Sequence, residues 1–332
     1  MEIVGFGQEP NQFRFKKDWN LLPSLAGIKS RLYKFEGKIQ NSGDLPLFFS
    51  HILRSGFGSA LKKTVCINNI SKNCMDCFLG EDCVYQKLFQ PSLPPGAPRL
   101  TSYSKIPQPF VVYTPKEGGL FQFGDTLQWY LLLIGKAVVS LPICVVAFSK
   151  MGWNGLGRDK IKFRILKVID ADENDEVFKG KGKIRFAPPI PFFYENNKKV
   201  KSIKIRIITP LRAKSQGKIA RNFPFKYFIR LLLLRASMLA SFHGEKEFPV
   251  NYKAIYKEAE KVITKEERLS YFQLNRFSMH DRKERDLSGM IGIIRYSGNL
   301  TPFMPLLKFG ERFHIGKSTS FGLGKYIIEI EA

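Results

Sequence analysis

Apolar residues recur along the chain with two different periods, and together these predict an α+β protein. From Leu45 to Lys63 a phenylalanine or leucine returns at every fourth position, as in a helix with one buried face. Residues 31–40 alternate apolar and polar instead, which is the pattern of a half-buried strand. Further strands are expected at 110–114, 126–134, 162–170, 204–210, 289–296 and 326–331, and further helices at 223–242 and 252–265.

The two halves of the chain show a similar order of elements, so we expect a duplicated fold. Each half ends in a glycine turn that feeds a late strand: Gly-Leu-Gly-Arg at 155–158 and Gly-Leu-Gly-Lys at 322–325. An acidic, proline-containing break covers about 170–196. The predicted organisation is an N-terminal extension (1–30), an N-terminal domain (31–196) with a cysteine-rich insertion (66–83), and a C-terminal domain (197–332) with a glycine-rich loop (316–324).

The C-terminal stretch HIGKSTSFGLGKYIIEI, residues 314–330, combines glycines, lysines and hydroxyl side chains. Its GKS resembles a nucleotide-binding P-loop. However, five residues separate Gly310 from Gly316 where a P-loop has four, and an alternating strand follows where a P-loop opens a helix. An ATP site is therefore not expected. Glycines let backbone amides approach an anion closely, so the loop suits a phosphate, with an ordinary turn as the alternative.

The chain is strongly basic, with 53 Lys and Arg against 29 Asp and Glu and a formal charge of +24. Between Lys198 and Arg235 there are twelve basic residues and no acidic one. Apolar residues interrupt this run, so we expect a strand and a helix in a folded basic wall rather than a disordered arm. Such a charge favours a polyanionic partner, either a nucleic acid or an anionic membrane surface.

Nothing near the start of the chain has the apolar core of a secretory signal. Residues 131–148 are apolar, but Lys136, Ser140 and Pro142 interrupt them. We expect a buried strand followed by a buried helix there rather than a membrane span. The expected location is therefore the reducing cytoplasm, without membrane attachment.

Four cysteines fall within eighteen residues, and a cytoplasmic chain with this spacing favours metal binding over disulfides. Zinc is the first expectation and an iron–sulfur cluster the alternative; four thiols without a metal also fit. Four thiolates leave no open position for a catalytic water, so the role would be structural. Cys144, in an apolar segment, is expected in the core. The candidate ligands are Cys66, Cys74, Cys77 and Cys83.

Several segments resemble the CRISPR-associated endoribonucleases of the RAMP superfamily, which cut precursor CRISPR RNA. The resemblance runs from about Tyr33 to the C-terminus. It implies two tandem ferredoxin-like domains, similar to RNA-recognition folds, with the glycine-rich loop near the RNA. It also implies CRISPR repeat RNA as the ligand and cleavage that needs no metal ion. The segments are LRSGFGSAL (53–61), CVYQKLF (83–89), GLGRDKIKF (155–163), IITPLR (207–212), NRFSMHDR (275–282) and, most specific of all, residues 298–326.

In the implied reaction the RNA's own 2′-hydroxyl is the nucleophile, and the products are a 2′,3′-cyclic phosphate and a 5′-hydroxyl. A histidine can serve as base or acid, and Lys or Arg can hold the phosphate. His51 is the first candidate, because it lies on the polar face of the 45–63 helix, with Tyr33 on the preceding strand as a helper. His314, next to the glycine loop, is the second. His280 is a third, His243 is expected only to end a helix, and a reaction without an essential histidine stays an alternative.

RNA contacts are expected on the polar helix face, at the glycine turns and at the basic motifs that carry the resemblance. The predicted RNA-binding residues are Arg54, Lys62, Arg158, Arg212, His280, Arg282, Lys317, Ser318, Gly322, Gly324 and Lys325.

Two other functions are consistent with the same sequence. One is a catalytically inactive RAMP subunit that holds RNA inside a CRISPR effector complex, with other effector proteins as partners. The other is a zinc-dependent DNA-binding regulator, which would need a basic recognition helix that the cysteine segment does not offer. A cleavage assay on repeat RNA distinguishes the inactive subunit from an endoribonuclease. Measuring the affinity for repeat RNA against that for duplex DNA of the same sequence tests the DNA-binding regulator.

Overall fold

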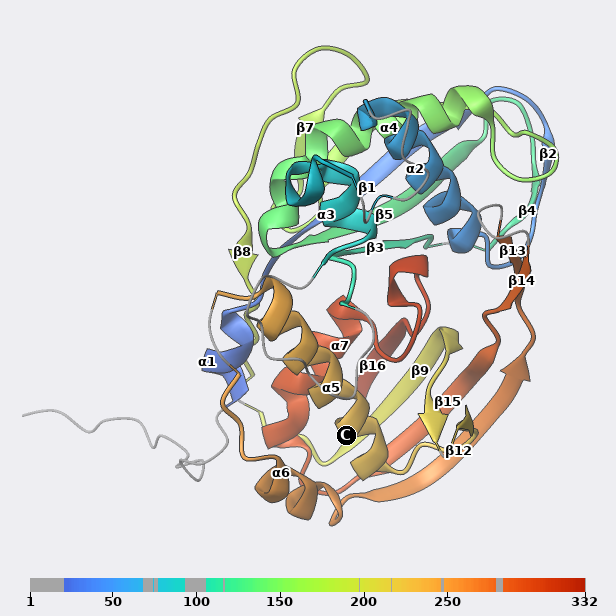
Figure 1. Ribbon diagram of the computed structural model, residues 1–332. Coiled ribbons are helices and arrows are strands. Elements are labelled where there is room, and N and C mark those ends of the chain that lie inside the picture. Colours follow the sequence, from blue (N-terminus) through green and yellow to red (C-terminus); the bar gives the residue numbers. More distant parts are fainter. Residues whose placement is uncertain are drawn as a thin grey trace, which may run out of the picture.

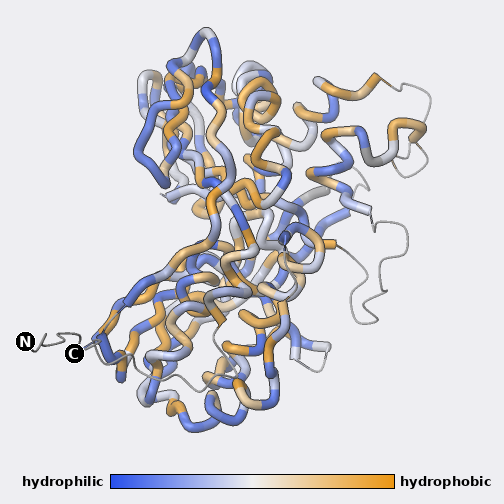
Figure 2. Tube along the Cα trace, turned by 90° about the vertical axis from the view of Figure 1, so that its left-hand side faces the viewer, coloured by the Kyte–Doolittle hydropathy of each residue, from blue (hydrophilic) through white to orange (hydrophobic). Residues whose placement is uncertain are grey.

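The computed structural model describes residues 21–67, 74, 77–92, 106–115, 117–196, 198–215, 217–245, 248–278 and 283–331. They form two α+β lobes, one above the other in Figure 1. The view in Figure 2, turned by 90°, shows that the lobes are joined through a narrower middle. The predicted α+β class is confirmed.

The upper lobe has the order strand, helix, strand, strand, helix, strand. In its main sheet the strands lie in the order β3-β5-β1-β6-β7, with β8 paired to the start of β1. Helices α2 and α4 cover one face of this sheet (Figure 1). The elements are β1 (Lys29–Ile39), β2 (Gly43–Leu45), α2 (Ser50–Val65), α3 (Val84–Phe89), β3 (Phe110–Tyr113), β4 (Gly119–Phe121), β5 (Thr126–Ile134), α4 (Leu141–Asn154), β6 (Phe163–Asp170), β7 (Asp175–Phe178) and β8 (Ile190–Pro191).

The lower lobe repeats this order, and its sheet runs β12-β15-β9-β16. If the four main strands of each lobe are numbered along the chain, their spatial order in both sheets is 2-3-1-4. This is the ferredoxin-like arrangement. The elements are β9 (Ser202–Leu211), β10 (Lys214–Ser215), β11 (Lys218–Ile219), α5 (Phe225–His243), α6 (Tyr252–Ala259), β12 (Ile263–Phe272), β13 (Asn275–Ser278), β14 (Lys283–Asp286), β15 (Gly289–Ser297), α7 (Met304–Phe313) and β16 (Tyr326–Glu331). Helix α1 (Leu21–Ala26) lies beside this lobe.

Two sequence predictions differ from the structure in this lobe. The helix expected over 252–265 ends at Ala259, and the ten-residue strand β12 follows it at once. Much of this strand, ITKEERLSYF, is exposed, and its sequence is accordingly rich in charged residues. It therefore lacks the regular alternation of apolar and polar residues that marks a half-buried strand. The hairpin β13–β14 was also not predicted.

The two lobes share a core because the upper sheet is buried on both faces at its β3–β5 edge. Val112 and Leu131 pack under α2 and α4, whereas their neighbours Val111 and Leu132 pack into the core of the lower lobe. Residues Leu21, Leu25 and Phe192 also join the lower core, although they precede the predicted boundary near residue 196. That boundary stays a prediction.

The helical stretch Gly135–Asn154, which includes α4, is long and apolar enough by composition to cross a membrane. Half of its most apolar window is buried inside the protein, and its side chains Val145, Phe148 and Met151 belong to the upper core. This is the pattern of a core helix, as the sequence indicated.

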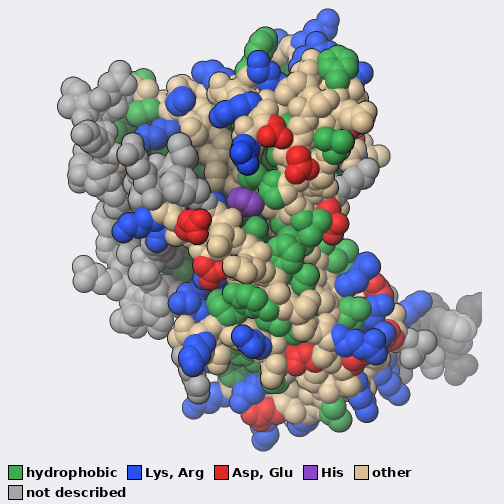
Figure 3. All heavy atoms as spheres, turned by 90° about the vertical axis from the view of Figure 1, so that its right-hand side faces the viewer, with side chains coloured by type: hydrophobic (Ala, Val, Ile, Leu, Met, Phe, Trp, Pro, Cys, Tyr) green, Lys and Arg blue, Asp and Glu red, His purple; other side chains and the backbone are tan. Residues whose placement is uncertain are grey.

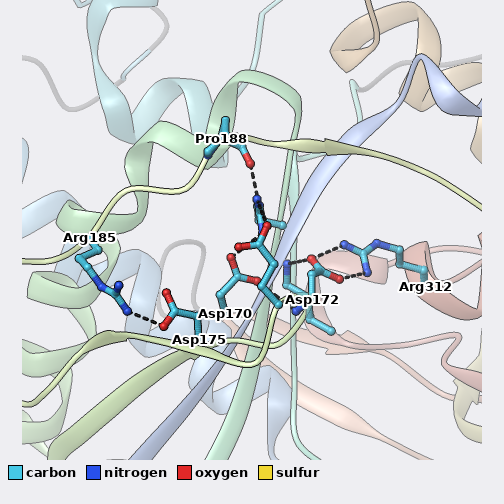
Figure 4. A network of polar contacts seen from close by, with 9 residues as sticks. Asp170, Asp172, Asp175, Arg185, Pro188 and Arg312 are labelled. Carbon is cyan, nitrogen blue, oxygen red and sulfur yellow. Dashed lines mark hydrogen bonds and ion pairs between the residues drawn. The ribbon is translucent and has the colours of Figure 1, made fainter.

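An ionic network ties the lobes together on the side away from α2 (Figure 4). Arg312, on α7 of the lower lobe, donates two hydrogen bonds to the carboxylate of Asp172 in the β6–β7 turn, at 2.6 and 2.8 Å. The same carboxylate accepts from the Leu32 amide. Beside it, the buried Arg31 pairs with Asp170 at 2.7 Å and donates to the Pro188 carbonyl.

We predict that Asp172→Asn lowers the free energy of unfolding by about 1.5–3 kcal/mol, because the charged, two-point hydrogen bonds to Arg312 are lost from a largely buried site. Asp175→Asn is the matched control: it is three residues away, and its pair with Arg185 is half exposed, so about 0–1 kcal/mol is expected. Urea unfolding followed by circular dichroism measures both. Equal losses in the two variants would contradict an interdomain role for Asp172.

Candidate active site between the two lobes

His51 lies at the start of α2, where the upper lobe meets the lower one. Its Nδ1 is 2.7 Å from the Phe48 carbonyl oxygen, which can only accept a hydrogen bond. The ring therefore carries its proton on Nδ1 when neutral, and Nε2 presents a lone pair. An imidazole held in this tautomer can take a proton from a hydroxyl group.

The side chain of His51 lines a narrow pocket made by both lobes and the glycine-rich loop. Phe48 and Ser50 come from the upper lobe, and the far side is built by Thr209 of β9 and by Leu274, which precedes the β13–β14 hairpin. The loop closes the pocket with Phe321, Gly322 and Leu323. On the face in Figure 3, a histidine side chain is visible at the surface where the lobes meet, with Lys and Arg side chains around it.

The pKa of His51 lies below its ordinary value of 6.5. Burial is the largest cause, because a buried site disfavours the charged imidazolium. The nearby Arg276 guanidinium lowers the pKa further, whereas the hydrogen bond to Phe48 opposes the shift. At neutral pH His51 is therefore the neutral base.

Two arginines lie on the ring of Phe321, one from each lobe. The guanidinium carbon of Arg54, on α2, is 4.3 Å from the ring centroid, and that of Arg276, on β13, is 4.8 Å from it. Arg54 also lies over Phe89, at 4.7 Å. Cation–π contacts of this kind are attractive, but each arginine repels the other.

No carboxylate in the described part of the chain pairs with either Arg54 or Arg276. Arg54 donates to the Gln108 side chain and Arg276 to the Ser55 hydroxyl. The Nε atoms of both are buried without a hydrogen-bond partner. Burial and the charge of Arg276 lower the pKa of Arg54 to about 10. Two half-buried cations with no counter-ion among the described residues make a site that an anion would stabilise.

The face of α2 that carries Arg54 is less exposed than its sequence indicated. Gly58 lies four residues after Arg54 and so on the same face of the helix, but a Cβ there would lie 2.6 Å from the Phe89 ring. Helix α3, which follows the cysteine segment, therefore packs directly on α2. Lys62 lies further along the same face, half exposed, with its Nζ 5.7 Å from the Tyr85 ring.

The glycine-rich loop is wedged between the lobes. A Cβ on Gly322, where φ is +80°, would lie 2.6 Å from the Val112 carbonyl oxygen of the upper sheet. The Gly322 carbonyl accepts from Thr209 Oγ1 at 2.8 Å, and the Gly324 amide donates to the Pro210 carbonyl at 3.1 Å. The second half of the loop thus fixes the lobes, whereas Lys317 in its first half is exposed and Ser318 half exposed.

Two of the predicted catalytic residues lie in the core, outside this pocket. His314 is fully buried, with Nδ1 3.2 Å from the Leu323 carbonyl oxygen and its ring 5.1 Å from that of Tyr113. Burial and the charge of Lys325 hold its pKa well below 6.5, so it braces the loop as a neutral ring. Tyr33 is also fully buried, among the side chains under α2 and α4, and burial raises its pKa.

The predicted RNA-binding residues are dispersed. Arg158 is exposed in the turn that packs against β2, and Arg212 pairs with Asp286 at 2.8 Å. Lys325 is largely buried: its Nζ donates to the Glu311 carbonyl, and burial lowers its pKa to about 8. His280 and Arg282 lie outside the described residues.

The basic run 198–235 does not form one wall. Arg235 is buried in α5 and donates to the Phe313 carbonyl, at 3.2 and 3.3 Å. Lys204 and Lys226 pair with Glu329 and Glu260. The run contains no acid in the sequence, but the fold brings acids to it from distant segments.

The cysteine segment connects α2 to α3. Cys66 follows α2 directly, Cys83 precedes α3, and all four thiols are half buried. The described residues contain no group of three or more His, Cys, Asp or Glu side chains positioned to share a metal ion. The structure therefore gives zinc no support. Cys144 is fully buried, as predicted.

Sequence reasoning missed Arg276, Phe321 and Thr209. Arg276 stands in the NRFSMHDR motif and Phe321 in the glycine loop, so both were within recognised segments. These residues come from three segments that are distant in sequence and meet only in the folded protein. Residue spacing along the chain does not reveal such contacts.

Comparison with known proteins agrees with this fold. Residues 205–326 match the family model of the CRISPR-associated endoribonuclease Cas6, and residues 28–189 match a model described as an N-terminal domain. An uncharacterized protein of Archaeoglobus fulgidus is 26% identical over 321 residues, covering 92% of this chain and 97% of that protein.

Two solved structures have the same fold. Cas6 of Thermus thermophilus is 14% identical, with a TM-score of 0.51 over 91% of this chain and 99% of that one. A chain of a partial Cas6-RT-Cas1–Cas2 complex is 12% identical, with a TM-score of 0.58 over 94% of this chain. This chain spans 47% of that longer one. The resemblance stated from the sequence is confirmed for residues 205–326, which match the Cas6 family model.

We predict that NMR titration of the ligand-free protein gives His51 a pKa below 6.5 and that Arg276→Gln raises it, because a nearby positive charge is removed. Arg268→Gln is the control, since that arginine is exposed on β12. The result would go against this geometry if His51 titrated identically in the wild type and Arg276→Gln.

Proposed function

We propose that this protein is an endoribonuclease that cleaves precursor CRISPR RNA within its repeats. The observation that carries the proposal is the pocket that His51 shares with the glycine-rich loop, near two arginines that have no acidic partner among the described residues. Cleavage of an RNA phosphodiester requires a base for the 2′-hydroxyl and positive charge near the phosphate. A neutral imidazole near two arginine side chains could provide both.

In the proposed reaction His51 takes the proton of the 2′-hydroxyl, and that oxygen attacks the adjacent phosphorus. The bond to the 5′-oxygen breaks, and the leaving oxygen takes a proton from water while the protonated His51 returns its own to solvent, giving a 2′,3′-cyclic phosphate and a 5′-hydroxyl. Arg54 and Arg276 would hold the non-bridging oxygens, whose charge grows in the transition state. No step of this scheme uses a metal ion.

The proposed RNA ligand is supported by the net charge of +24 and by the exposed Lys317 in the first half of the glycine-rich loop. Phosphate contacts would make binding fall steeply with salt. Specificity would come from hairpin shape and unpaired bases. Other CRISPR proteins are proposed partners, since one solved relative belongs to a Cas6-RT-Cas1–Cas2 complex.

An inactive RNA-binding subunit is the second candidate, and one observation favours it. His51 is only 8% exposed, and its pocket is narrow, so a scissile phosphate reaches Nε2 only if the lobes or the hairpin shift. A protein that binds RNA without cutting it would need no such movement.

Incubating the purified protein with the repeat RNA of its own genome, in EDTA, tests the proposal. We predict one cut per repeat with a cyclic phosphate end, and a loss of about 10²–10⁴-fold in the single-turnover rate for His51→Ala. Lys63→Ala, an exposed position on the same helix, should keep the wild-type rate. Tight binding without a cut would establish the inactive subunit instead, and full activity of His51→Ala would remove His51 from the mechanism.

We also propose a structural zinc ion at Cys66, Cys74, Cys77 and Cys83, with an iron–sulfur cluster as the alternative. The chemistry of four thiols fits either group. Tyr85 lies within electrostatic reach of both Cys74 and Cys83, so two of the four cysteines come near the same side chain. Binding would draw the ligands together and order the segment that positions α3.

We predict that the purified protein contains about one equivalent of zinc and that chelation lowers its melting temperature. Elemental analysis and thermal unfolding measure the two effects. Cys77→Ser should abolish the zinc content, and Cys144→Ser, which changes a core thiol, should keep it. A metal-free protein whose melting temperature does not respond to added zinc would disprove the site.

A further inference from the structure

A second cavity, separate from the His51 pocket, opens in the lower lobe, where the strands β12 and β15 extend past the start of α5. Its volume is about 340 Å³, within the range of small-ligand sites. It combines one exposed aromatic ring with a carboxylate, an amide and a guanidinium. The lining residues are Arg221, Asn222, Glu267, Leu269, Tyr271 and Met290.

The walls of this cavity are of the kind that binds a flat, polar ring. Tyr271 is 49% exposed, so its ring is accessible from solvent, whereas Leu269 on the same side of β12 packs against the lower core. Met290 pairs with Tyr271 across the strands and forms a buried apolar floor. Glu267 uses one oxygen to accept from the Phe223 amide at 2.6 Å, which leaves its second oxygen for a ligand.

The cavity and the His51 pocket lie at neighbouring positions along one strand, β9. Thr209 lines the His51 pocket, and Leu211, two residues further, pairs with Met290 of the cavity floor. The end of β9 thus lines the His51 pocket and pairs beside the cavity floor. An RNA that follows this end of the strand away from His51 would pass the cavity.

The glycine-rich loop reaches the same end of β9. The Lys317 amide donates to the Arg212 carbonyl at 2.7 Å, and Arg212 follows Leu211 directly. The Lys317 side chain is exposed, and so is Arg221 at the cavity rim. An exposed cation thus stands at the cavity, and another is carried by the loop at this end of β9, so both could contact a sugar–phosphate backbone.

We propose that this cavity binds one unpaired RNA base next to the cleaved phosphate and that it prefers guanine. The proposal rests on the proposed function for the position of the RNA. The base would stack on Tyr271, and the adjacent N1–H and N2–H groups of guanine would donate to the Glu267 carboxylate, one to its free oxygen and one to the remaining lone pair of the oxygen that accepts from the Phe223 amide. Uracil offers a single N–H between two carbonyls, which the carboxylate repels.

The test is the equilibrium affinity for two fluorescein-labelled 12-nucleotide RNAs, one all uridine and one with a single central guanosine, measured by anisotropy. We expect the guanosine to increase affinity by about 5- to 100-fold. Tyr271→Ala and Glu267→Gln should each remove this difference. Gln keeps an oxygen for the Phe223 amide, so the second variant preserves the fold while changing the recognition.

Ile263→Ala is the matched control, because Ile263 is an exposed hydrophobic residue at the other end of β12 and should leave the preference unchanged. Equal affinity for the two RNAs, or a guanosine preference that both cavity variants retain, overturns the proposal. The anisotropy measurement reports binding alone, so its result does not depend on whether the protein cleaves RNA. The repeat-cleavage assay on the same preparations tests cleavage separately. Loss of cutting with an intact guanosine preference would count against the proposed function alone.

Discussion

The close approach of the glycine-rich loop to the upper lobe is the contact on which the rest of the structure depends. Gly322 lies against the Val112 carbonyl and the Ser50 side chain, at a positive φ where a Cβ would collide. Hydrogen bonds from Thr209 and to Pro210 hold the same turn on β9 of the lower lobe. One turn is thereby fixed to both sheets, and the lobes close on it.

This closure brings together charges that separate segments carry. Arg54 comes with α2, Arg276 with the β13–β14 hairpin, and Phe321 with the loop, and the three meet only because the lobes are docked. The two arginines repel each other, and no acidic side chain among the described residues pairs with either of them. Arg212, by contrast, has an acidic partner in Asp286. A cationic site that is left uncompensated in a folded protein indicates a ligand that supplies the negative charge.

The proposed chemistry and the proposed base cavity follow from the same strand. Thr209 and Leu211 place them side by side, and the exposed Lys317 lies at the same end of β9. Recognition of the base and cleavage of the phosphate would then be coupled through a rigid strand. The interdomain pair Arg312–Asp172 joins the lobes at a separate contact, between α7 and the β6–β7 turn.

Periodicity alone determined much of this protein: the strands β1, β5, β9 and β16, the helices α2 and α5, the repeated glycine turns, and His51 on α2. These features are local, so the residues that cause them are neighbours in sequence. Only the tertiary structure decided that Arg276 stands beside His51, that acids from distant segments neutralise the basic run at Lys204 and Lys226, and that His314 and Tyr33 are buried. β12 escaped prediction for a related reason: an exposed strand lacks the apolar face that marks strands in sequence, and only its pairing with β15 defines it.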